Sequence, residues 1–399
     1  MSAPPSSSVS LTAESSHRHI SSEDLVCFSH LRWDFVYQRP QHLLSRAART
    51  RRVFYVEEPV LDGRTAFMLS RREPCGVTVA TPHLTPDEGR FTLRVLLDFF
   101  MSAHAIDRYI SWYYTPLAWQ FTSHLQPAAV VYDCMDELSA FEGAPDGLKE
   151  AERALLARAD LVLTGGHSLY EAKRGLHPNV HEFPSSVDVE HFAAARKRGV
   201  DPDDQAVIPA PRIGFFGVLD ERLDRELLDA IAERCPGWHF VLIGPVVKID
   251  PALLPHRPNI HYLGPKRYQD LPSYIAGWDV AMLPFARNAA TRYISPTKTP
   301  EYLAAGKPVV STSIADVVRP YGQERLVWIA DHPDHFVASV RDALCARPSE
   351  WLPRADAFLA SNSWDKSWTR ISERVRAAVI DRQRRQQATM QFASSTEGR

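Results

Sequence analysis

The chain has 399 residues, which is long enough for two domains and a substantial apolar core. Its 46 lysine and arginine residues against 48 aspartate and glutamate residues give a formal net charge of −2, so no overall field favours nucleic acid. The five cysteines are scattered without a CxxC spacing, which argues against a zinc site or a disulfide framework and fits a reducing cytoplasm. No apolar run reaches the roughly 18–20 residues of a membrane-spanning helix, so we expect a soluble or at most peripheral protein.

The first half of the chain alternates short apolar strands with helices. Residues 1–24 are rich in Ser, Pro and Ala and predict a disordered arm rather than a signal peptide. A strand, a long loop, a helix and a strand follow, at 24–28, 29–40, 41–48 and 52–56. Further strands are expected at 76–84, 91–96, 110–115, 130–133, 160–164 and 179–184, and helices at 117–125 and 148–158. This pattern predicts a first Rossmann-like domain over residues 25–195.

A second series of strands and helices follows a polar, proline-containing segment, residues 196–210, which we interpret as an interdomain linker. Strands are expected at 212–216, 239–243, 259–264, 280–283, 309–312 and 326–330, and helices at 224–234, 271–275, 297–305 and 334–346. The second Rossmann-like domain is therefore predicted over residues 211–362. A final helix is predicted over 363–383, followed by a disordered tail over 384–399.

The segment Ser295–Thr312 reads as a loop, a short helix and a buried strand. Ser295 and Thr297 flank a proline at the expected helix start, and several free backbone N–H groups there suit a phosphate. Lys298 adds a positive charge, and Glu301, three residues later, faces the same side of the helix. A cation for a diphosphate and a carboxylate for sugar hydroxyls predict a nucleotide-sugar site. Taken alone, the fragment also fits an ordinary helix–strand junction in a doubly wound sheet.

This segment resembles the donor-binding signature of the retaining GT-B glycosyltransferases, the group 1 or family 4-like superfamily. Glu301 and the run Gly306–Val310 match that signature, in the Ser-Pro-x-Lys-x-x-Glu-Tyr variant of a bacterial branch. Tyr293 stands where the superfamily often has a second glutamate. The resemblance implies an α/β GT-B fold, with two doubly wound Rossmann-like domains facing across a cleft. It also implies that the C-terminal helix crosses back to the first domain.

The resemblance further implies a function. The expected reaction moves a sugar from a nucleoside-diphosphate sugar, most simply a UDP-sugar, to a saccharide or lipid-linked acceptor, with retention of configuration. The setting it implies is bacterial surface or exopolysaccharide synthesis, in the cytoplasm or peripherally at the inner membrane face. We expect no metal, no cofactor other than the nucleotide-sugar co-substrate, and no nucleic-acid partner.

Other donor-side candidates follow two more strands of the second domain. Gly217 would let a diphosphate approach the backbone, and Arg222 would neutralise it, although Arg222 could instead lie on a solvated helix face. The family has an arginine where this chain has Val218. Lys266 and Tyr268 lie in the loop that holds the base in the family, but a tyrosine there could equally be a packing residue.

In the first domain, the loop 29–40 is longer and richer in functional groups than a simple strand-to-helix turn requires. Its candidates for the acceptor side of the cleft are His30, Arg32, Trp33 and Arg39, with Arg39 among the proposed catalytic residues. Asp133 and Asp136 follow another strand end and could orient an acceptor hydroxyl or act as a base. The alternative for Asp136 is that it caps a helix.

Two other function classes stay open. One is a catalytically silent GT-B protein that binds donor or scaffolds a polysaccharide complex, which the departures at Tyr293 and Val218 allow. The other is a UDP-sugar epimerase, which would need carboxylates and a histidine around the sugar. Donor hydrolysis or transfer would separate the first of these from a glycosyltransferase.

Overall fold

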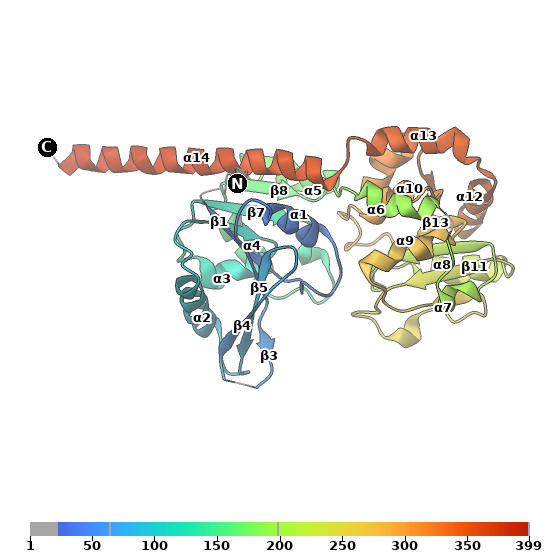
Figure 1. The fold of residues 1–399 in the computed structure, drawn as a ribbon, viewed down its shortest axis with the longest axis horizontal. Helices are drawn as coiled ribbons and strands as arrows, with labels where there is room; N and C mark the ends of the chain where they lie inside the picture. Colours follow the sequence, from blue (N-terminus) through green and yellow to red (C-terminus); the bar gives the residue numbers. More distant parts are fainter. Residues whose placement is uncertain (1–22, 64, 198, 398–399) are drawn as a thin grey trace, which may run out of the picture.

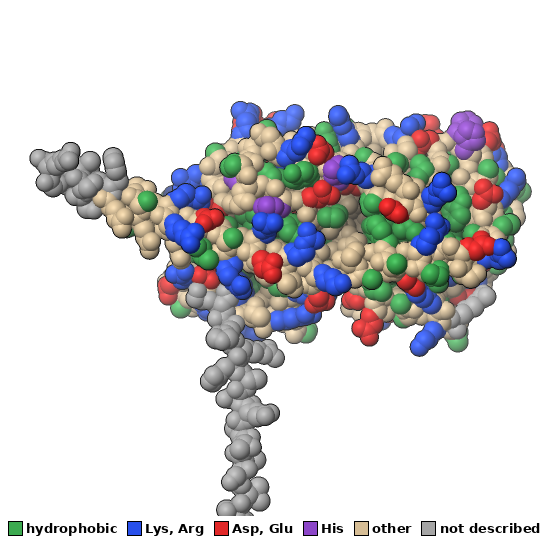
Figure 2. All heavy atoms as spheres, turned by 90° about the horizontal axis from the view of Figure 1, so that it is seen from above, with side chains coloured by type: hydrophobic (Ala, Val, Ile, Leu, Met, Phe, Trp, Pro, Cys, Tyr) green, Lys and Arg blue, Asp and Glu red, His purple; other side chains and the backbone are tan. Residues whose placement is uncertain are grey.

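The structure is a computed structural model that describes residues 23–63, 65–197 and 199–397. Two α/β lobes lie side by side, and a long C-terminal helix runs along the top of the first lobe (Figure 1). Of the predicted disordered arm, residues 1–22 lie outside the described residues, and Asp24 already belongs to the first strand. Acidic and basic side chains are interspersed over the face seen from above (Figure 2), as the near-zero net charge predicts.

The first domain is built on a nine-stranded sheet with the order β3-β5-β2-β1-β6-β7-β8-β9, and β4 pairs with β5. Every neighbouring pair is parallel except β4 with β5. The central strands are buried on both faces, which explains their nearly continuous apolar sequence. The strands are β1 (Asp24–Ser29), β2 (Val53–Glu57), β3 (Val60–Leu61), β4 (Phe67–Arg72), β5 (Val77–Leu84), β6 (Tyr109–Tyr113), β7 (Ala129–Cys134), β8 (Leu161–Thr164) and β9 (Val180–Glu182).

Helices cover both faces of this sheet. They are α1 (Arg39–Ala47), α2 (Arg90–Ala103), α3 (Trp119–Thr122), α4 (Leu148–Leu156) and α5 (His167–Lys173), with the 3₁₀ turns η1 (Pro116–Ala118) and η2 (Leu138–Ala140). The prediction of a strand at 91–96 was wrong, because this stretch lies within α2. Leu93, Leu97, Phe100 and Met101 are buried at helical spacing, and this period decides the element.

The second domain carries a six-stranded, all-parallel sheet with the order β12-β11-β10-β13-β14-β15. Its strands are β10 (Arg212–Phe216), β11 (His239–Ile243), β12 (Ile260–Tyr262), β13 (Val280–Leu283), β14 (Val309–Ser311) and β15 (Trp328–Ile329). Its α-helices are α8 (Arg225–Arg234), α9 (Leu271–Ala276), α10 (Lys298–Ala304), α11 (Ala315–Val317), α12 (Pro333–Cys345) and α13 (Pro348–Leu359). Its short turns are η4 (Pro251–Leu253), η5 (Tyr268–Asp270) and the π-helical η6 (Val318–Gly322).

Between the sheets lie α6 (Val189–Ala193), η3 (Ala194–Arg196) and α7 (Asp203–Ala206). The segment predicted as a linker, 196–210, therefore contains a short helix. Gln205 of that helix is buried and donates to the Tyr274 carbonyl of the second domain at 2.9 Å.

The last helix, α14 (Trp364–Glu397), crosses back to the first domain. It packs against α1, β7 and β8, and Trp364 and Ile371 are buried in the first domain's core. The crossing helix that the sequence led us to expect is thus confirmed. The predicted disordered tail over 384–399 is not, since the helix continues to Glu397. The residues after 383 include neither glycine nor proline before Gly398, so nothing in the local sequence ends the helix earlier.

Both sheets reverse their strand order next to their first strand, and these two points face each other. In the first sheet β1 lies between β2 and β6, and in the second β10 lies between β11 and β13. Loops at the carboxyl ends of such strands diverge and leave a crevice in which open α/β sheets bind ligands. The fold therefore predicts a site between the loops that follow β1, β7, β10, β11 and β13.

Candidate active site

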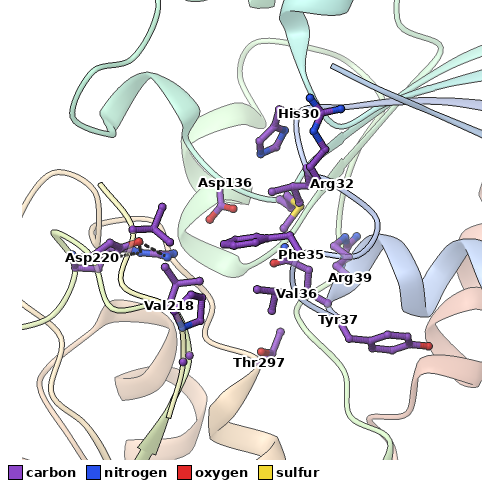
Figure 3. Close-up of a pocket in the computed structure, with 18 of the residues that line it drawn as sticks. His30, Arg32, Phe35, Val36, Tyr37, Arg39, Asp136, Val218, Asp220 and Thr297 are labelled. Carbon is purple, nitrogen blue, oxygen red and sulfur yellow. Dashed lines mark hydrogen bonds and ion pairs between the residues drawn. The ribbon is translucent and has the colours of Figure 1, made fainter. Parts of the chain in front are cut away.

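A cavity of about 1170 Å³ lies between the two domains, at the carboxyl ends of these strands. Figure 3 shows residues from both domains projecting into it. Every site residue predicted from the sequence lines this cavity except Asp133. The residues that do are His30, Arg32, Trp33, Arg39, Asp136, Gly217, Arg222, Lys266, Tyr268, Ser295, Thr297, Lys298 and Glu301. The fold therefore brings together groups that are as far as 271 positions apart in the chain, counting from His30 to Glu301.

Gly217 lies where the backbone of β10 meets Lys298. Its φ of 146° falls in a region that favours glycine, and a Cβ there would lie 2.2 Å from the Lys298 Cε atom. Gly244, which follows β11, also has no room for a side chain. A Cβ there would lie 1.8 Å from the Gly217 carbonyl oxygen. Neither position accepts a larger residue without displacing the lysine or the neighbouring strand end.

Lys298 and Glu301 lie on the first turn of α10, as the sequence predicted. Glu301 is only 4 % exposed, and its Oε2 atom has no hydrogen-bond partner. Burial raises the pKa of Glu301 to about 7, although the nearby Lys298 opposes this shift. Burial also lowers the pKa of Lys298, which Glu301 opposes in turn. A buried carboxylate oxygen without a partner is rare in folded proteins, so this site is suited to receive a donor group from a ligand.

Arg222 lies in the cavity wall before α8, so it is not on a solvated helix face. Its Nε and Nη2 atoms donate to the two oxygens of Asp220 at 2.9 and 2.7 Å. The Arg222 guanidinium also lies over the ring of Phe141, a residue of the first domain. The distance from the Arg222 Cζ atom to the Phe141 ring centroid is 5.6 Å. Lys248, from the loop after β11, places its Nζ atom 4.9 Å from the same ring. Phe141 thus contacts two cations of the opposite domain.

Asp136 projects into the cavity from the loop after β7 (Figure 3). Burial raises its pKa to about 6, against the nearby charges of Arg222, Lys298 and Lys248. The nearest short helix, η2, has Glu137 at its N-cap position, so Asp136 is not the cap. Asp136 is therefore available to a ligand in the cleft, with a pKa close to neutrality.

Two neighbouring carboxylates, Asp133 and Glu137, point elsewhere. Asp133 is fully buried and accepts from the Arg39 Nε atom at 3.0 Å on both oxygens. Arg39 also donates from Nη1 to the Phe183 carbonyl at 2.8 Å, and it is only 2 % exposed. Glu137 pairs with Lys173 at 2.7 Å. The structure corrects the prediction for Asp133: it lies within β7 and pairs with Arg39, whereas Asp136, in the loop after the strand, is the one of the three that lines the cavity.

The loop between β1 and α1 is anchored by two of its predicted ligand groups. Arg32 donates to the Glu57 carboxylate at 3.2 Å and to the Glu58 carbonyl at 2.5 Å. The Trp33 backbone N–H donates to Glu57 at 2.7 Å, and its ring packs on Tyr55. These contacts fix the loop and leave His30 and the tip of the loop to form the cavity wall.

His30 projects into the cavity on the same side as Asp136 (Figure 3). Burial lowers its pKa to about 4, with the charge of Lys248 adding to the effect, so the ring is neutral at pH 7. Its Nδ1 atom is buried without a hydrogen-bond partner. Like Glu301, His30 offers an unsatisfied polar atom near the cavity.

Lys266 and Tyr268 line the cavity; Lys266 and the Tyr268 ring have protein partners, whereas the buried Tyr268 hydroxyl has no hydrogen-bond partner. The Lys266 Nζ atom donates to Asp204 at 2.6 Å. The Tyr268 ring stacks on Tyr37 of the first domain, with centroids 4.5 Å apart, and on His191 at 4.4 Å. In this arrangement the Tyr268 ring packs between elements of the two domains, which is the packing role that the sequence left open.

Ser295 and Thr297 occupy the loop between β13 and α10. The Ser295 carbonyl accepts a hydrogen bond from the Ser185 hydroxyl at 3.1 Å, and Thr297 borders the cavity (Figure 3). Tyr293, the residue in place of the usual second glutamate, is not among the cavity-lining residues. It packs instead against the apolar core of the first domain.

The sequence analysis did not single out Asp220, Lys248, Phe35 and Phe141, four residues of the cavity wall that bear on its chemistry. Asp220 and Lys248 follow β10 and β11 by four and five positions, so strand-end position was a usable signal for both. Phe35, which is 47 % exposed, projects toward the middle of the cavity from the loop already singled out (Figure 3). Phe141 lies in a glycine-rich loop and gave no sequence signal.

Residues 210–345 match the family model described as "Glycosyl transferases group 1". TuaH of Bacillus subtilis (strain 168), whose name assigns it to teichuronic acid biosynthesis as a glycosyltransferase, is 27 % identical over 278 residues, covering 64 % of this chain and 68 % of TuaH.

Solved structures show the same fold. Sucrose-phosphate synthase from Thermosynechococcus elongatus has a TM-score of 0.67 at 13 % identity, covering 90 % of this chain and 100 % of that one. HepE from Anabaena in complex with UDP-glucose has a TM-score of 0.64 at 12 % identity, covering 89 % and 99 %. Residues 210–345 are thus similar to the group 1 glycosyltransferases, in a chain with a GT-B-like fold.

Proposed function

We propose that this protein transfers a sugar from a UDP-sugar to a saccharide or lipid-linked acceptor, with retention of configuration, in the synthesis of a bacterial surface polysaccharide or exopolysaccharide. The observation that carries the proposal is the buried, partnerless carboxylate oxygen of Glu301 beside Lys298, in a cleft that also holds Arg222 and Lys248. The naming of TuaH for teichuronic acid biosynthesis, and the UDP-glucose in the HepE complex, support this class of donor and product.

In this proposal the second domain holds the donor. Glu301 accepts hydrogen bonds from the ribose hydroxyls, while Lys298 and Arg222 contact the diphosphate and stabilise the charge that grows on it during bond cleavage. Gly217 admits the diphosphate to the backbone. Lys248 adds a third cation near the same place and stands in for the arginine that Val218 replaces.

The first domain orients the acceptor. Asp136, ionised above a pKa of about 6, accepts a hydrogen bond from the attacking hydroxyl and holds it on the donor face that the leaving group occupies. The acceptor oxygen bonds to the anomeric carbon as the bond from that carbon to the phosphate oxygen breaks. The hydroxyl proton passes to the leaving phosphate. His30, neutral at pH 7, lines the same wall.

The proposed reaction needs no bound metal, because the protein supplies cations for the diphosphate. Among the described residues, no group of three or more His, Cys, Asp or Glu side chains has a metal-binding arrangement. We expect transfer activity to persist in EDTA. Complete loss of activity that magnesium restores would contradict this part of the proposal.

The donor assignment is tested by comparing UDP with 2′-deoxy-UDP. Wild type should bind UDP at least about 10-fold more tightly, the scale of a hydrogen bond to a charged group. Glu301→Ala should bind both nucleotides with similar affinity, as measured by calorimetry. Both UDP and a UDP-sugar should raise the melting temperature of wild type, because they bind only the folded state.

Glu233→Ala, which alters an exposed residue of α8 away from the cavity, serves as the matched control and should keep the wild-type preference. If Glu301→Ala discriminates UDP from its deoxy analogue as wild type does, Glu301 does not contact the 2′-hydroxyl and the ribose assignment is wrong.

A second candidate function is a catalytically silent donor-binding or scaffold protein. The packing of Tyr293 into the first domain favours it, because no carboxylate occupies the cavity from that position. Such a protein would bind UDP-sugar with the same dependence on Glu301, yet release no UDP when acceptors are supplied. An epimerase would instead convert the UDP-sugar without any acceptor, which product analysis by chromatography detects.

A further inference from the structure

A buried lysine lies behind the first-domain wall of the cavity and has no part in the reaction proposed above. Lys173, the last residue of α5, is only 3 % exposed. Its Nζ atom donates to the Glu137 carboxylate at 2.7 Å and to the two oxygens of Glu152, on α4, at 2.7 and 2.8 Å. Lys173 therefore ties α5 and α4 to the segment that follows β7 through charge-assisted hydrogen bonds.

The two carboxylates around Lys173 are themselves held by further hydrogen bonds. The Tyr132 hydroxyl donates to Glu152 at 2.8 Å, and the Ser139 hydroxyl donates to Glu137 at 2.8 Å. Each charged member of this cluster thus has at least two partners. A buried polar network that is satisfied in this way makes its surroundings rigid.

Asp136 lies directly beside this cluster. It precedes Glu137 in the chain, and its backbone carbonyl accepts a hydrogen bond from the Cys134 thiol at 3.5 Å. The backbone of Met135 packs against Gly165, because a Cβ on Gly165 would lie 2.8 Å from the Met135 carbonyl oxygen. The residues on both sides of Asp136 are therefore fixed by contacts within the first domain.

The carboxylate of Asp136 depends on these contacts for its direction. Among the described residues, no hydrogen bond holds the Asp136 carboxylate itself, so its place in the cleft is set by the backbone that carries it. A displacement of about 1 Å in a catalytic group can cost on the order of 100-fold in rate. Whatever holds Glu137 in place should therefore affect the reaction at Asp136.

We propose that Lys173 is a positioning residue for sugar transfer: by holding Glu137, it directs the neighbouring Asp136 carboxylate into the cleft. This inference rests on the proposed function, because it takes Asp136 as the group that orients the acceptor hydroxyl. Lys173 does not line the cavity, so it acts through Glu137 and not by contact with a ligand.

The ionisation of Asp136 reports on its position. Burial raises its pKa to about 6; Arg222, Lys298 and Lys248 of the second domain oppose this shift, and Asp220 adds to it. If the segment after β7 relaxes toward solvent, Asp136 becomes better hydrated, and its pKa should fall toward the ordinary value of 3.8. A loss of global stability alone does not change this pKa, so the measurement separates positioning from a purely structural role.

The test is a carbon-13 NMR titration of the full-length protein, labelled at the aspartate carboxyl groups. The Asp136 signal is identified by its absence from Asp136→Asn, and it should titrate at about pH 6 in wild type. Lys173→Met and Glu137→Gln should each lower this midpoint by roughly one pH unit or more, because less burial favours the charged form. Both should also slow transfer by roughly 10-fold or more without changing UDP affinity.

Lys173→Arg, which keeps the charge, should recover most of the wild-type midpoint and rate. The matched control is Arg382→Met, which breaks another ion pair with a buried carboxylate, that of Asp160, at 2.8 Å. Asp160 precedes β8, so it lies at the opposite end of the parallel strands β7 and β8 from Asp136. The control should leave the Asp136 midpoint unchanged.

Circular dichroism establishes which variants fold, and Glu137→Gln decides the question if Lys173→Met does not. The proposal is overturned if the folded variants keep the wild-type Asp136 midpoint, or if Arg382→Met moves that midpoint as far as Lys173→Met does. Failure of the proposed function would look different, because Asp136→Asn itself would then transfer sugar at the wild-type rate.

Discussion

At the scale of single residues, the cleft contains charges that cannot all be satisfied without a ligand. Arg222 and Asp220 neutralise each other through three side-chain hydrogen bonds. Among the described residues, Lys298, Lys248, Glu301 and Asp136 form no such bidentate pair. Burial pushes the pKa values of Glu301 and Asp136 toward neutrality, to about 7 and about 6. A site that leaves ionisable groups poised in this way is typical of binding and catalysis, not of a structural ion-pair network.

Asp136→Asn should lower the transfer rate by roughly 100-fold or more, the scale of a lost general-base or orienting group. UDP affinity should stay near wild type, because Asp136 belongs to the acceptor side. In wild type the rate should fall as the pH drops below about 6, where Asp136 becomes protonated. The measurements are steady-state transfer across pH 5–8 and calorimetric UDP binding.

The control for this experiment is Glu150→Gln, which changes an exposed carboxylate of α4 that pairs with Arg153 and does not line the cavity. Circular dichroism establishes that both variants fold. Wild-type transfer by a folded Asp136→Asn variant would show that the carboxylate has no part in the reaction.

The raised pKa of Glu301 gives a stability prediction. Its carboxyl group titrates at about 7 in the folded protein and near its ordinary value of 4.5 when unfolded, so the folded state holds the proton more tightly. The free energy of unfolding should therefore contain a contribution that is present below about pH 4.5 and is lost as the pH rises through about 7. Glu301→Gln removes that titration.

We compare the melting temperature of Glu301→Gln minus that of wild type at two pH values. This difference should be more positive at pH 8 than at pH 5. Differential scanning calorimetry without ligand measures this difference. Glu233→Gln, on the exposed face of α8, should show no such trend. A pH-independent difference for Glu301→Gln would mean that Glu301 ionises normally in the folded protein.

At the scale of secondary-structure elements, the buried Arg39–Asp133 pair ties the first turn of α1 to the end of β7. Arg39 also reaches the Phe183 carbonyl just after β9, so one side chain joins three elements beneath the cavity. We infer that this pair positions the loop between β1 and α1 and does not contact substrate. The catalytic role proposed from the sequence for Arg39 stays a prediction, and these contacts add a supporting role.

Arg39→Ala should destabilise the protein by about 3–5 kcal/mol, because it leaves the Asp133 carboxylate buried and unpaired. The double variant Arg39→Met/Asp133→Leu, which removes both charges, should recover a large part of that loss. Urea denaturation of each variant measures the free energy of unfolding. If Arg39→Ala is as stable as wild type but fails to transfer sugar, Arg39 is catalytic after all.

At the scale of the whole molecule, the cleft depends on how the two domains are held. Asp316 of the second domain accepts a hydrogen bond from the Ser168 backbone N–H at 2.9 Å. Gly166 allows this approach, because a Cβ there would lie 2.0 Å from the Asp316 Oδ2 atom and 2.7 Å from the Ser295 Cβ atom. The aromatic stack of Tyr37 on Tyr268 forms a second contact between the domains.

Gly166→Ala should shift the domains apart and lower transfer by roughly 10-fold or more, since displacing one half of a site by an ångström is costly. Its φ of −173° is accessible to alanine, so the effect is steric contact and not backbone strain. UDP affinity should change by only a few-fold, because the donor groups lie in the second domain. Gly175→Ala, with nothing within 4 Å of its Cβ, is the matched control.

Steady-state transfer rates and UDP affinities of Gly166→Ala and Gly175→Ala test this prediction. Small-angle scattering should show a larger radius of gyration for Gly166→Ala than for wild type. Equal transfer by Gly166→Ala and Gly175→Ala would show that this contact does not set the cleft.

The sequence by itself determined the periodic features of this protein. Apolar strands such as 212–216 and 239–243 were predictable because burial on both faces demands continuous apolar residues. Glu301 and Lys298 were predictable as a pair because they lie within one helical turn of each other, so local sequence alone places them on the same side of the helix. The helix over 90–103 was mistaken for a strand because its two apolar faces hide the helical period that its burial reveals.

The tertiary structure alone decided which strand-end groups share the cleft. The carboxylates Asp133, Asp136 and Glu137 are adjacent in sequence, yet one binds Arg39, one faces the cavity and one binds Lys173. Lys248 and Phe141 meet across the cleft although 107 positions separate them. Local sequence fixes periodicity and backbone conformation, whereas the direction and partner of a side chain depend on which distant segments pack beside it.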